Sequence, residues 1–134
     1  MKVVTQWQQG LTFKGTNEAG QSIEMDGEGK APSPMHMMLM AVGGCSSIDV
    51  VMILAKARQQ ISDCVCHLDA ERAENPPRVF KKIHAHYVVT GKSLKEKQVE
   101  RACQLSMEKY CSASLMLQAS VEISHSFEIV EEAE

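Results

Sequence analysis

Residues 31–51 of this chain read APSPMHMMLMAVGGCSSIDVV. Only Asp49 in this stretch carries a full charge, so the pattern predicts a helix that is apolar on nearly all sides and occupies the centre of the fold. Ser33 and Pro34 are typical of a helix start, because an N-cap serine accepts hydrogen bonds from unpaired backbone N–H groups and proline fits the first turn. We expect the helix to run from Met35 to about Gln60.

Short segments on both sides of this helix alternate apolar and polar residues, which is typical of strands. Three of them precede the helix and predict a β-meander, and three follow it together with a second helix. The pattern predicts a single α+β domain over residues 1–134. The expected strands cover residues 3–7, 11–15, 22–25, 62–70, 79–90 and 121–130, and the second helix covers residues 94–107 with a short helical turn at 113–117.

The charge and the N-terminal residues exclude several classes of partner. The formal net charge is -3 and no basic cluster is present, which argues against nucleic acid, because phosphate binding needs several positive charges on one surface. The N-terminus has no apolar core followed by a cleavage site, so we expect no secretion signal. The longest apolar stretch, Met37 to Val42, is too short to cross a bilayer. We therefore expect a cytoplasmic protein with no membrane partner.

Five cysteines occur, at positions 45, 64, 66, 103 and 111. In a reducing compartment such a set is not expected to form a permanent disulfide framework, and the count is odd. We expect most of them to be buried thiols and any disulfide to be transient and functional.

Cys45 and Cys111 have the most unusual surroundings of the five. Cys45 follows Gly43-Gly44, a pair that predicts a kink or a very close backbone approach, and precedes the hydroxyl of Ser46. Cys111 lies at a break in the second helical region, where free N–H groups of the next turn can stabilise an anion. Asp49, one turn after Cys45, would raise the pKa of that thiol. A cysteine that reacts with peroxide also needs a second thiol, because its sulfenic acid is otherwise overoxidised.

A zinc site built from two cysteines and two histidines is the alternative use of these residues, since four such ligands on adjacent strands can form a tetrahedral site. The direction of the side chains argues against it, because paired strands share ligands only across a common face. Cys64 and Cys66 share a face with Leu68, whereas His84 and His86 lie opposite the apolar row of their strand. We therefore expect no metal. That apolar row consists of Val79, Ile83, Ala85, Tyr87 and Val89.

Residues 31–51 and the later motif Glu108-Lys109-Tyr110-Cys111-Ser112 together resemble the OsmC/Ohr family, and its YhfA-like branch most closely. The similarity covers essentially the whole chain, and the two cysteine motifs have the separation found in the family. The resemblance implies an OsmC/Ohr-like α+β fold in which antiparallel sheets wrap around central helices in an intertwined homodimer, with the sites at the subunit interface.

The same resemblance implies a thiol peroxidase that acts against oxidative stress by reducing organic hydroperoxides and, less well, hydrogen peroxide. Transferred to this sequence, Cys45 is the peroxidatic residue that forms a sulfenic acid, and Cys111 is the resolving residue that closes a Cys45–Cys111 disulfide. An external dithiol, such as a lipoylated protein, restores both thiols, and no metal or organic cofactor is required.

The sequence departs from the well-studied peroxidases of this family at two positions. Those enzymes hold the attacking thiolate with an arginine from the N-terminal region, whereas the first arginine here is Arg58. Lys14 or Lys30 replaces such a residue only in part. Those enzymes also carry a glutamate near the start of the central helix, where this chain has His36. His36, Ser46 and Asp49 are the candidate partners of the thiolate or of the pocket around it.

These departures keep a second hypothesis open. In this alternative the chain is a non-catalytic protein of the same fold, which binds a small hydrophobic molecule in an apolar interface pocket and keeps Cys45 as a poorly activated thiol. The two cysteines in matching motifs favour the enzyme, and the missing arginine favours the binding protein.

Overall fold

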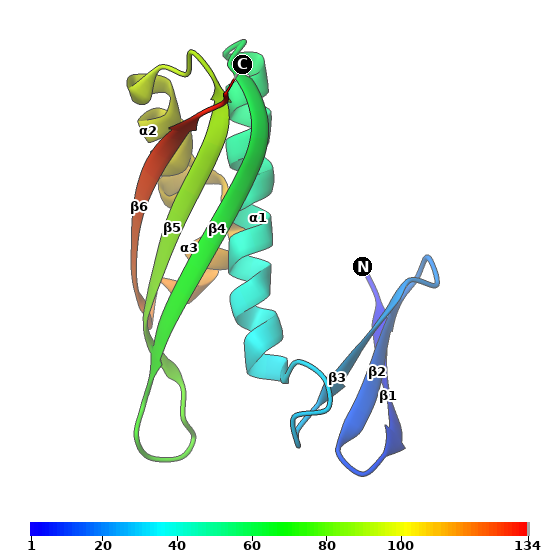
Figure 1. The fold of residues 1–134 in the computed structure, drawn as a ribbon. Helices are drawn as coiled ribbons and strands as arrows, with labels where there is room; N and C mark the ends of the chain where they lie inside the picture. The colour runs from blue at the N-terminus through cyan, green and yellow to red at the C-terminus, as the bar shows by residue number, and fades with distance from the viewer. Residues whose placement is uncertain (134) are drawn as a thin grey trace. The chain divides into compact units, whose positions relative to one another are not determined.

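The computed structural model describes residues 1–133, which form two compact units, one ending at Leu39 and the other beginning at Met40 (Figure 1). The helices and strands occur in the order expected from the sequence, so the predicted α+β class is confirmed.

The first unit contains the predicted meander. Strands β1 (Val3–Gln9), β2 (Thr12–Asn17) and β3 (Ser22–Asp26) form an antiparallel sheet in the order β1-β2-β3. The register places Trp7 opposite Phe13 and Phe13 opposite Met25, so large apolar side chains share one face of this sheet. Trp7 and Phe13 are exposed, so this apolar face is not buried within one chain.

Helix α1 (Pro34–Lys56) begins as predicted. The backbone N–H of His36 donates to Ser33 Oγ at 3.0 Å, which is the expected N-cap bond. The helix ends four residues before Gln60, because Arg58 adopts a left-handed conformation with a φ of 59°. The N–H groups of Arg58 and Gln59 then donate to the carbonyl oxygens of Ala55 and Leu54, a Schellman arrangement that satisfies the end of the helix.

By length and composition, α1 could cross a membrane: it has 23 residues, and its most apolar window has a mean hydropathy of 2.0. The length argument based on Met37 to Val42 does not hold, because that apolar run ends at Gly43 whereas the helix continues through Gly43-Gly44 to Lys56. The central helix of a soluble protein passes the same test. Here α1 buries a stripe of residues that includes Val42, Val50 and Leu54. The opposite stripe exposes Met40, Ile48, Val51 and Met52.

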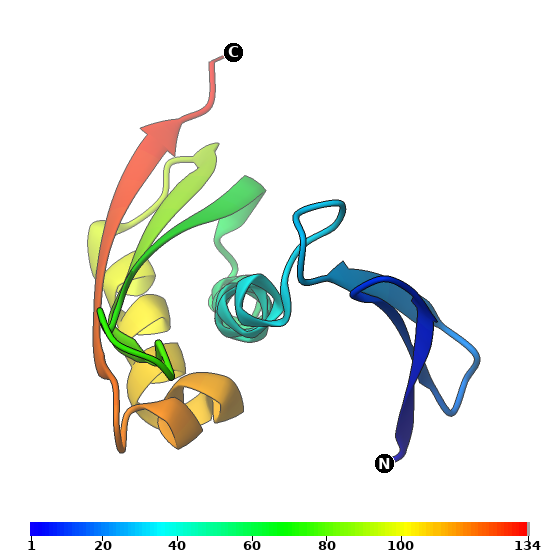
Figure 2. The same ribbon diagram turned by 90° about the horizontal axis from the view of Figure 1, so that it is seen from below.

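In the second unit a three-stranded sheet lies beside α1. Figure 2 shows this arrangement with the helix viewed along its axis. Strands β4 (Gln60–Arg72) and β5 (Phe80–Lys92) are antiparallel, and β6 (Glu122–Glu131) pairs with β5 in parallel. This sheet is therefore mixed, whereas the resemblance implied antiparallel sheets. Parallel neighbours require a crossover connection. Helix α2 (Glu96–Leu105), the π-helical turn η1 (Ser106–Tyr110) and helix α3 (Ser112–Leu117) supply it.

One face of this sheet forms the core. Ala85, Tyr87 and Val89 of β5 are fully buried, in one cluster with residues of α1 and α2. Val79 does not belong to this row: it precedes β5 and is exposed, whereas Phe80 is buried. The register shifts between Glu71 and Arg72 of β4, because β5 has one extra residue, Lys81, opposite them. An extra residue reverses the alternation of faces, so Phe80 rather than Val79 faces the core.

Candidate functional site

Close packing of α1 on β4 fixes the position of Cys45. A Cβ atom on Gly43 would lie 2.5 Å from Leu68 Cδ1, so a larger residue at this position would have to displace the Leu68 side chain. The sequence-based expectation of a close approach is confirmed, and α1 continues through Gly43-Gly44 without a break. Cys45 follows on the helix and is partly exposed as a free thiol.

Cys111 is positioned by the end of η1. Its N–H donates to the Ser106 carbonyl at 2.7 Å, and its extended backbone makes it the N-cap residue of α3. The N–H of Ser114 donates to Cys111 Sγ at 3.4 Å. Unlike Cys45, Cys111 is fully buried.

The two thiols lie next to each other. The Cys111 side chain is near enough to affect the pKa of Cys45, and Cys45 Sγ lies 3.7 Å from the hydroxyl of Ser112, the residue after Cys111. The predicted pair therefore meets in one site, formed by α1 and the start of α3.

The two thiols have opposite pKa shifts. Hydrogen bonding, above all from the backbone N–H of Ala113 and then from the side chains of Cys111 and Ser112, lowers the pKa of Cys45 against the effect of burial. Burial raises the pKa of Cys111. Cys45 is therefore the more acidic thiol of the pair and Cys111 the less acidic one, and the Cys111 thiol lies in donor position to the Val42 carbonyl at 3.9 Å.

The donors that lower the pKa of Cys45 are backbone groups and hydroxyls rather than an arginine. The sequence pointed to free N–H groups after Cys111, but assigned them to Cys111 itself. In the structure, the N–H of Ser114 donates to Cys111 Sγ, whereas the N–H groups of Ser112 and Ala113 lower the pKa of Cys45. The helix break before Ser112 indicated from sequence that free N–H groups occur there. Only the tertiary structure shows that two of them lie near Cys45.

The carboxylate of Asp49 bonds to Ser106, and it is not among the groups that set the pKa of Cys45. Its Oδ2 accepts a hydrogen bond from Ser106 Oγ at 3.0 Å. Backbone donors, burial, Cys111 and Ser112 dominate the pKa of Cys45, and the net shift is downward rather than the increase expected from Asp49. The expectation that Asp49 raises this pKa is therefore not met.

Ser46 points into the core. It is fully buried, and its Oγ lies 2.8 Å from Ser106 Oγ and in hydrogen-bonding contact with the Tyr87 hydroxyl. Ser106 also donates to the Ser46 carbonyl at 3.2 Å. This hydroxyl network ties α1 to β5 and to η1, the segment that leads to Cys111. Ser46 thus supports the elements that carry the thiols, and Ser112 supplies the hydroxyl near Cys45.

His36 takes part in capping α1. Its Nδ1 accepts a hydrogen bond from the N–H of Ser33 at 3.1 Å, while its own N–H donates to Ser33 Oγ. This is a capping box in which histidine stands in the usual place of glutamate or glutamine. A role of His36 toward the Cys45 thiolate stays a prediction, as do roles of Lys14 and Lys30.

The register of β4 and β5 confirms the argument about the zinc alternative. Cys64 and Cys66 pair with Val89 and Tyr87 on the core face, whereas His84 and His86 pair with residues on the other face. The histidines instead bond to hydroxyls, with His84 Nδ1 2.7 Å from Ser124 Oγ. Within residues 1–133, no group of three or more potential ligands is placed to hold a metal ion.

The sequence model of a family described as "OsmC-like protein" matches residues 27–126. The chain belongs to the OsmC-like family. Protein YhfA of Escherichia coli (strain K12) is 53% identical over 132 residues, which cover 97% of this chain and 98% of that protein. The resemblance inferred from the two cysteine motifs is thereby confirmed.

Two solved structures agree with this assignment. A hypothetical protein from Aquifex aeolicus VF5 is 32% identical with a TM-score of 0.90, covering 98% of this chain and 97% of that one. An organic hydroperoxide resistance protein OsmC from Legionella pneumophila has a TM-score of 0.72 at 17% identity, covering 96% and 97%. The second comparison shows a shared OsmC/Ohr fold.

The pKa difference predicts the order in which the thiols react with an alkylating agent. We expect the alkylation rate of Cys45 by iodoacetamide to reach half its maximum at a lower pH than that of free cysteine, because only the thiolate reacts and its pKa is lowered. Cys64, whose pKa is raised by burial, should reach its half-maximum at a higher pH. Quenched labelling between about pH 5 and about pH 10, followed by peptide mass mapping, measures the alkylation rates of Cys45 and Cys64 in one sample. A half-maximum for Cys45 at or above that of free cysteine contradicts this assignment.

Proposed function

We propose that this chain is a two-cysteine thiol peroxidase of the cytoplasm that reduces organic hydroperoxides and, more weakly, hydrogen peroxide. The observation that carries the proposal is the contact between a partly exposed thiol of lowered pKa, Cys45, and a buried thiol of raised pKa, Cys111. The name of the Legionella pneumophila relative, an organic hydroperoxide resistance protein, supports the choice of substrate.

The geometry supports a sequence of three steps. The Cys45 thiolate attacks the terminal oxygen of ROOH, the O–O bond breaks, and the leaving alkoxide takes a proton from solvent to become ROH. The sulfur of Cys111 then attacks Cys45 Sγ of the sulfenic acid, so that an S–S bond forms and the hydroxyl leaves as water. An external dithiol reduces the Cys45–Cys111 disulfide by thiol–disulfide exchange and is itself oxidised to a disulfide.

The neighbouring donors explain how Cys45 reacts without an arginine. The Ala113 and Ser112 N–H groups and the Ser112 hydroxyl stabilise the thiolate, so a full positive charge is not needed for a lowered pKa. A buried Cys111 with a raised pKa stays protonated until the sulfenic acid forms, which protects it from direct oxidation.

Mass spectrometry of the wild-type protein tests the proposal. We expect one equivalent of cumene hydroperoxide to convert the reduced protein to a species about 2 Da lighter, with a Cys45–Cys111 cross-link in the peptide map. Cys64→Ser is the matched control, because it removes a thiol outside the pair and should give the same disulfide. If Cys45 is oxidised no faster than glutathione in the same buffer, the proposal fails and the non-catalytic alternative stands.

We also propose that the protein is a homodimer. Two apolar surfaces within the described residues are exposed: the face of the β1-β2-β3 sheet that carries Trp7 and Phe13, and the stripe of α1 that carries Met40 and Ile48. A three-stranded sheet needs packing on one face to be stable. A second copy of the chain would cover these surfaces.

Light scattering coupled to size exclusion tests the dimer. We expect a mass twice the 14.8 kDa of one chain, and we expect Ile48→Glu to shift the protein toward the monomer, because a charge would be buried in the interface. Val65→Glu adds the same charge at an exposed position of β4 and should leave the mass unchanged. A monomeric wild-type protein, or equal effects of the two substitutions, contradicts this interface.

A further inference from the structure

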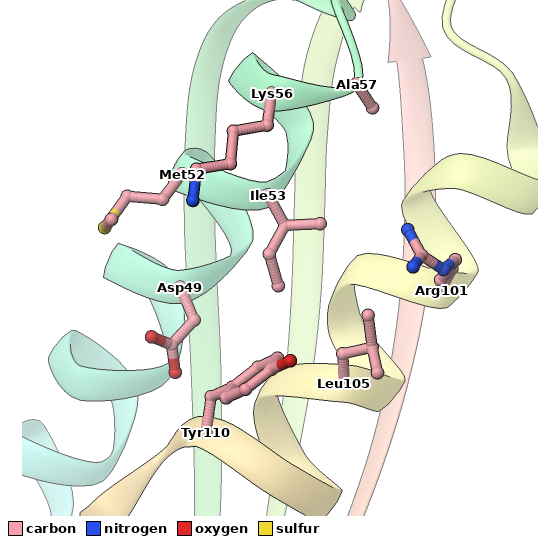
Figure 3. A pocket seen from close by; sticks show the side chains of 8 residues that line it. All are labelled: Asp49, Met52, Ile53, Lys56, Ala57, Arg101, Leu105 and Tyr110. Carbon is pink, nitrogen blue, oxygen red and sulfur yellow. The ribbon is translucent and has the colours of Figure 1, made fainter.

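A cavity of about 540 Å³ lies between the second half of α1 and the segment formed by α2 and η1 (Figure 3). This volume is within the range of pockets that bind small molecules. Its wall is largely apolar, and it lies within the second unit of the chain. The apolar side chains of the wall include Met52, Ile53, Leu105 and Tyr110.

The charged groups of this cavity are mainly positive. Lys56 of α1 and Arg101 of α2 line it, and Figure 3 shows them on either side of Ile53. Both are exposed, and neither forms an ion pair with any residue in the described part of the chain. Asp49 is the one acidic residue of the lining, and its carboxylate already accepts a hydrogen bond from Ser106.

We propose that this cavity binds a small amphipathic anion, with its acid group on Arg101, its apolar chain along Ile53, Leu105 and Tyr110, and Lys56 adding positive charge to the same cavity. The guanidinium group of arginine offers parallel donors that match the two oxygens of an acid group, and lysine adds a second positive charge. An apolar chain fits the wall, because its burial removes apolar surface from water on both sides. A neutral or cationic ligand leaves both positive groups without a partner.

This binding site goes beyond the proposed peroxidase chemistry and does not depend on it. Its lining includes neither thiol, but it contains Asp49, one helical turn after Cys45, and Tyr110, which directly precedes Cys111.

Calorimetric titration with decanoate tests the proposal. The titration uses the full-length double variant Cys45→Ser/Cys111→Ser, in which the two thiols cannot react, so its outcome is separate from that of the peroxidase experiment. We expect saturable binding of decanoate and at least about tenfold weaker binding of decanol, which has the same chain without the charge. Decyl phosphate in a parallel titration shows whether the site prefers a phosphate or a carboxylate as the acid group.

Charge-removing substitutions in the same background locate the acid group. Arg101→Gln should weaken decanoate binding about tenfold and Lys56→Gln several-fold, whereas Lys97→Gln, an exposed position of α2 outside the lining, should leave it unchanged. The substituted side chains are exposed, so the fold is expected to tolerate the changes. The proposal is overturned if decanoate does not bind, if decanol binds equally well, or if Lys97→Gln weakens binding as much as Arg101→Gln.

Discussion

Replacing Cys45 with serine is expected to lower the rate constant for hydroperoxide reduction at least about a thousandfold. The serine hydroxyl stays protonated near neutral pH, so the donors around this position have no thiolate to stabilise. Cys111 cannot take over the attack, because it is fully buried and its pKa is raised. The remaining thiols lie outside the pair and have raised pKa values where a shift is resolved.

Steady-state consumption of cumene hydroperoxide with an excess of a small dithiol measures this loss. Cys111→Ser is the informative companion: we expect it to keep the first reaction with peroxide and then to accumulate Cys45 in sulfinic or sulfonic form. Cys64→Ser controls for the loss of a thiol as such and should retain wild-type activity. Equal small losses in Cys45→Ser and Cys64→Ser would show that the peroxide reaction is not centred on Cys45.

The lowered pKa of Cys45 shows how a thiolate can be favoured without an arginine. A point charge and a set of hydrogen-bond donors both favour the charged form of a thiol. Here the donors belong to the backbone of residues 112 and 113 and to the hydroxyl of Ser112. The break between η1 and α3 frees these N–H groups, so the irregular backbone before Cys111 serves both cysteines.

Periodicity and end signals predicted most of the fold. The N-cap at Ser33, the meander before α1 and the alternating strands after it all occur close to the expected residues. These features depend on local sequence, which a single chain displays directly. The errors at Gln60 and at Val79 arose where the backbone is irregular: a left-handed arginine follows the end of α1, and a register shift occurs at the start of β5.

The sequence selected two cysteines that lie close together in the structure, but it did not predict the contacts of the residues around them. Local pattern and family resemblance both selected Cys45 and Cys111, and the structure brings them together. The contacts of Ser46 and Asp49 depend on residues about 40 to 60 positions away, as in the Ser46–Tyr87 and Asp49–Ser106 hydrogen bonds. Helical spacing places these side chains on a face of α1, but does not show what lies opposite that face.

Gly91→Ala is expected to destabilise the protein by about 3 kcal/mol, the upper end of the usual effect of overpacking. A Cβ atom at Gly91 would overlap the carbonyl oxygen of Gln60 on the paired strand and lie 2.9 Å from Leu94 Cδ2. Leu94 can move, but the Gln60 carbonyl belongs to the backbone of β4, so relief requires the two strands to separate. The Gly91 carbonyl also accepts a hydrogen bond from the N–H of Glu132 at 2.8 Å, which couples this position to the end of β6.

Denaturant unfolding at one fixed protein concentration measures the loss, because the stability of a dimer depends on concentration. A change of about 3 kcal/mol should appear as a lower midpoint with an unchanged slope, and as a fall in Tm of roughly 10 °C. Thr90→Ala is the matched control at the neighbouring position, where a smaller side chain meets no overlap and should change stability by less than about 1 kcal/mol. If Gly91→Ala unfolds like Thr90→Ala, the β4–β5 pair can widen at this end without loss, and the contact between Gly91 and Gln60 does not limit the fold.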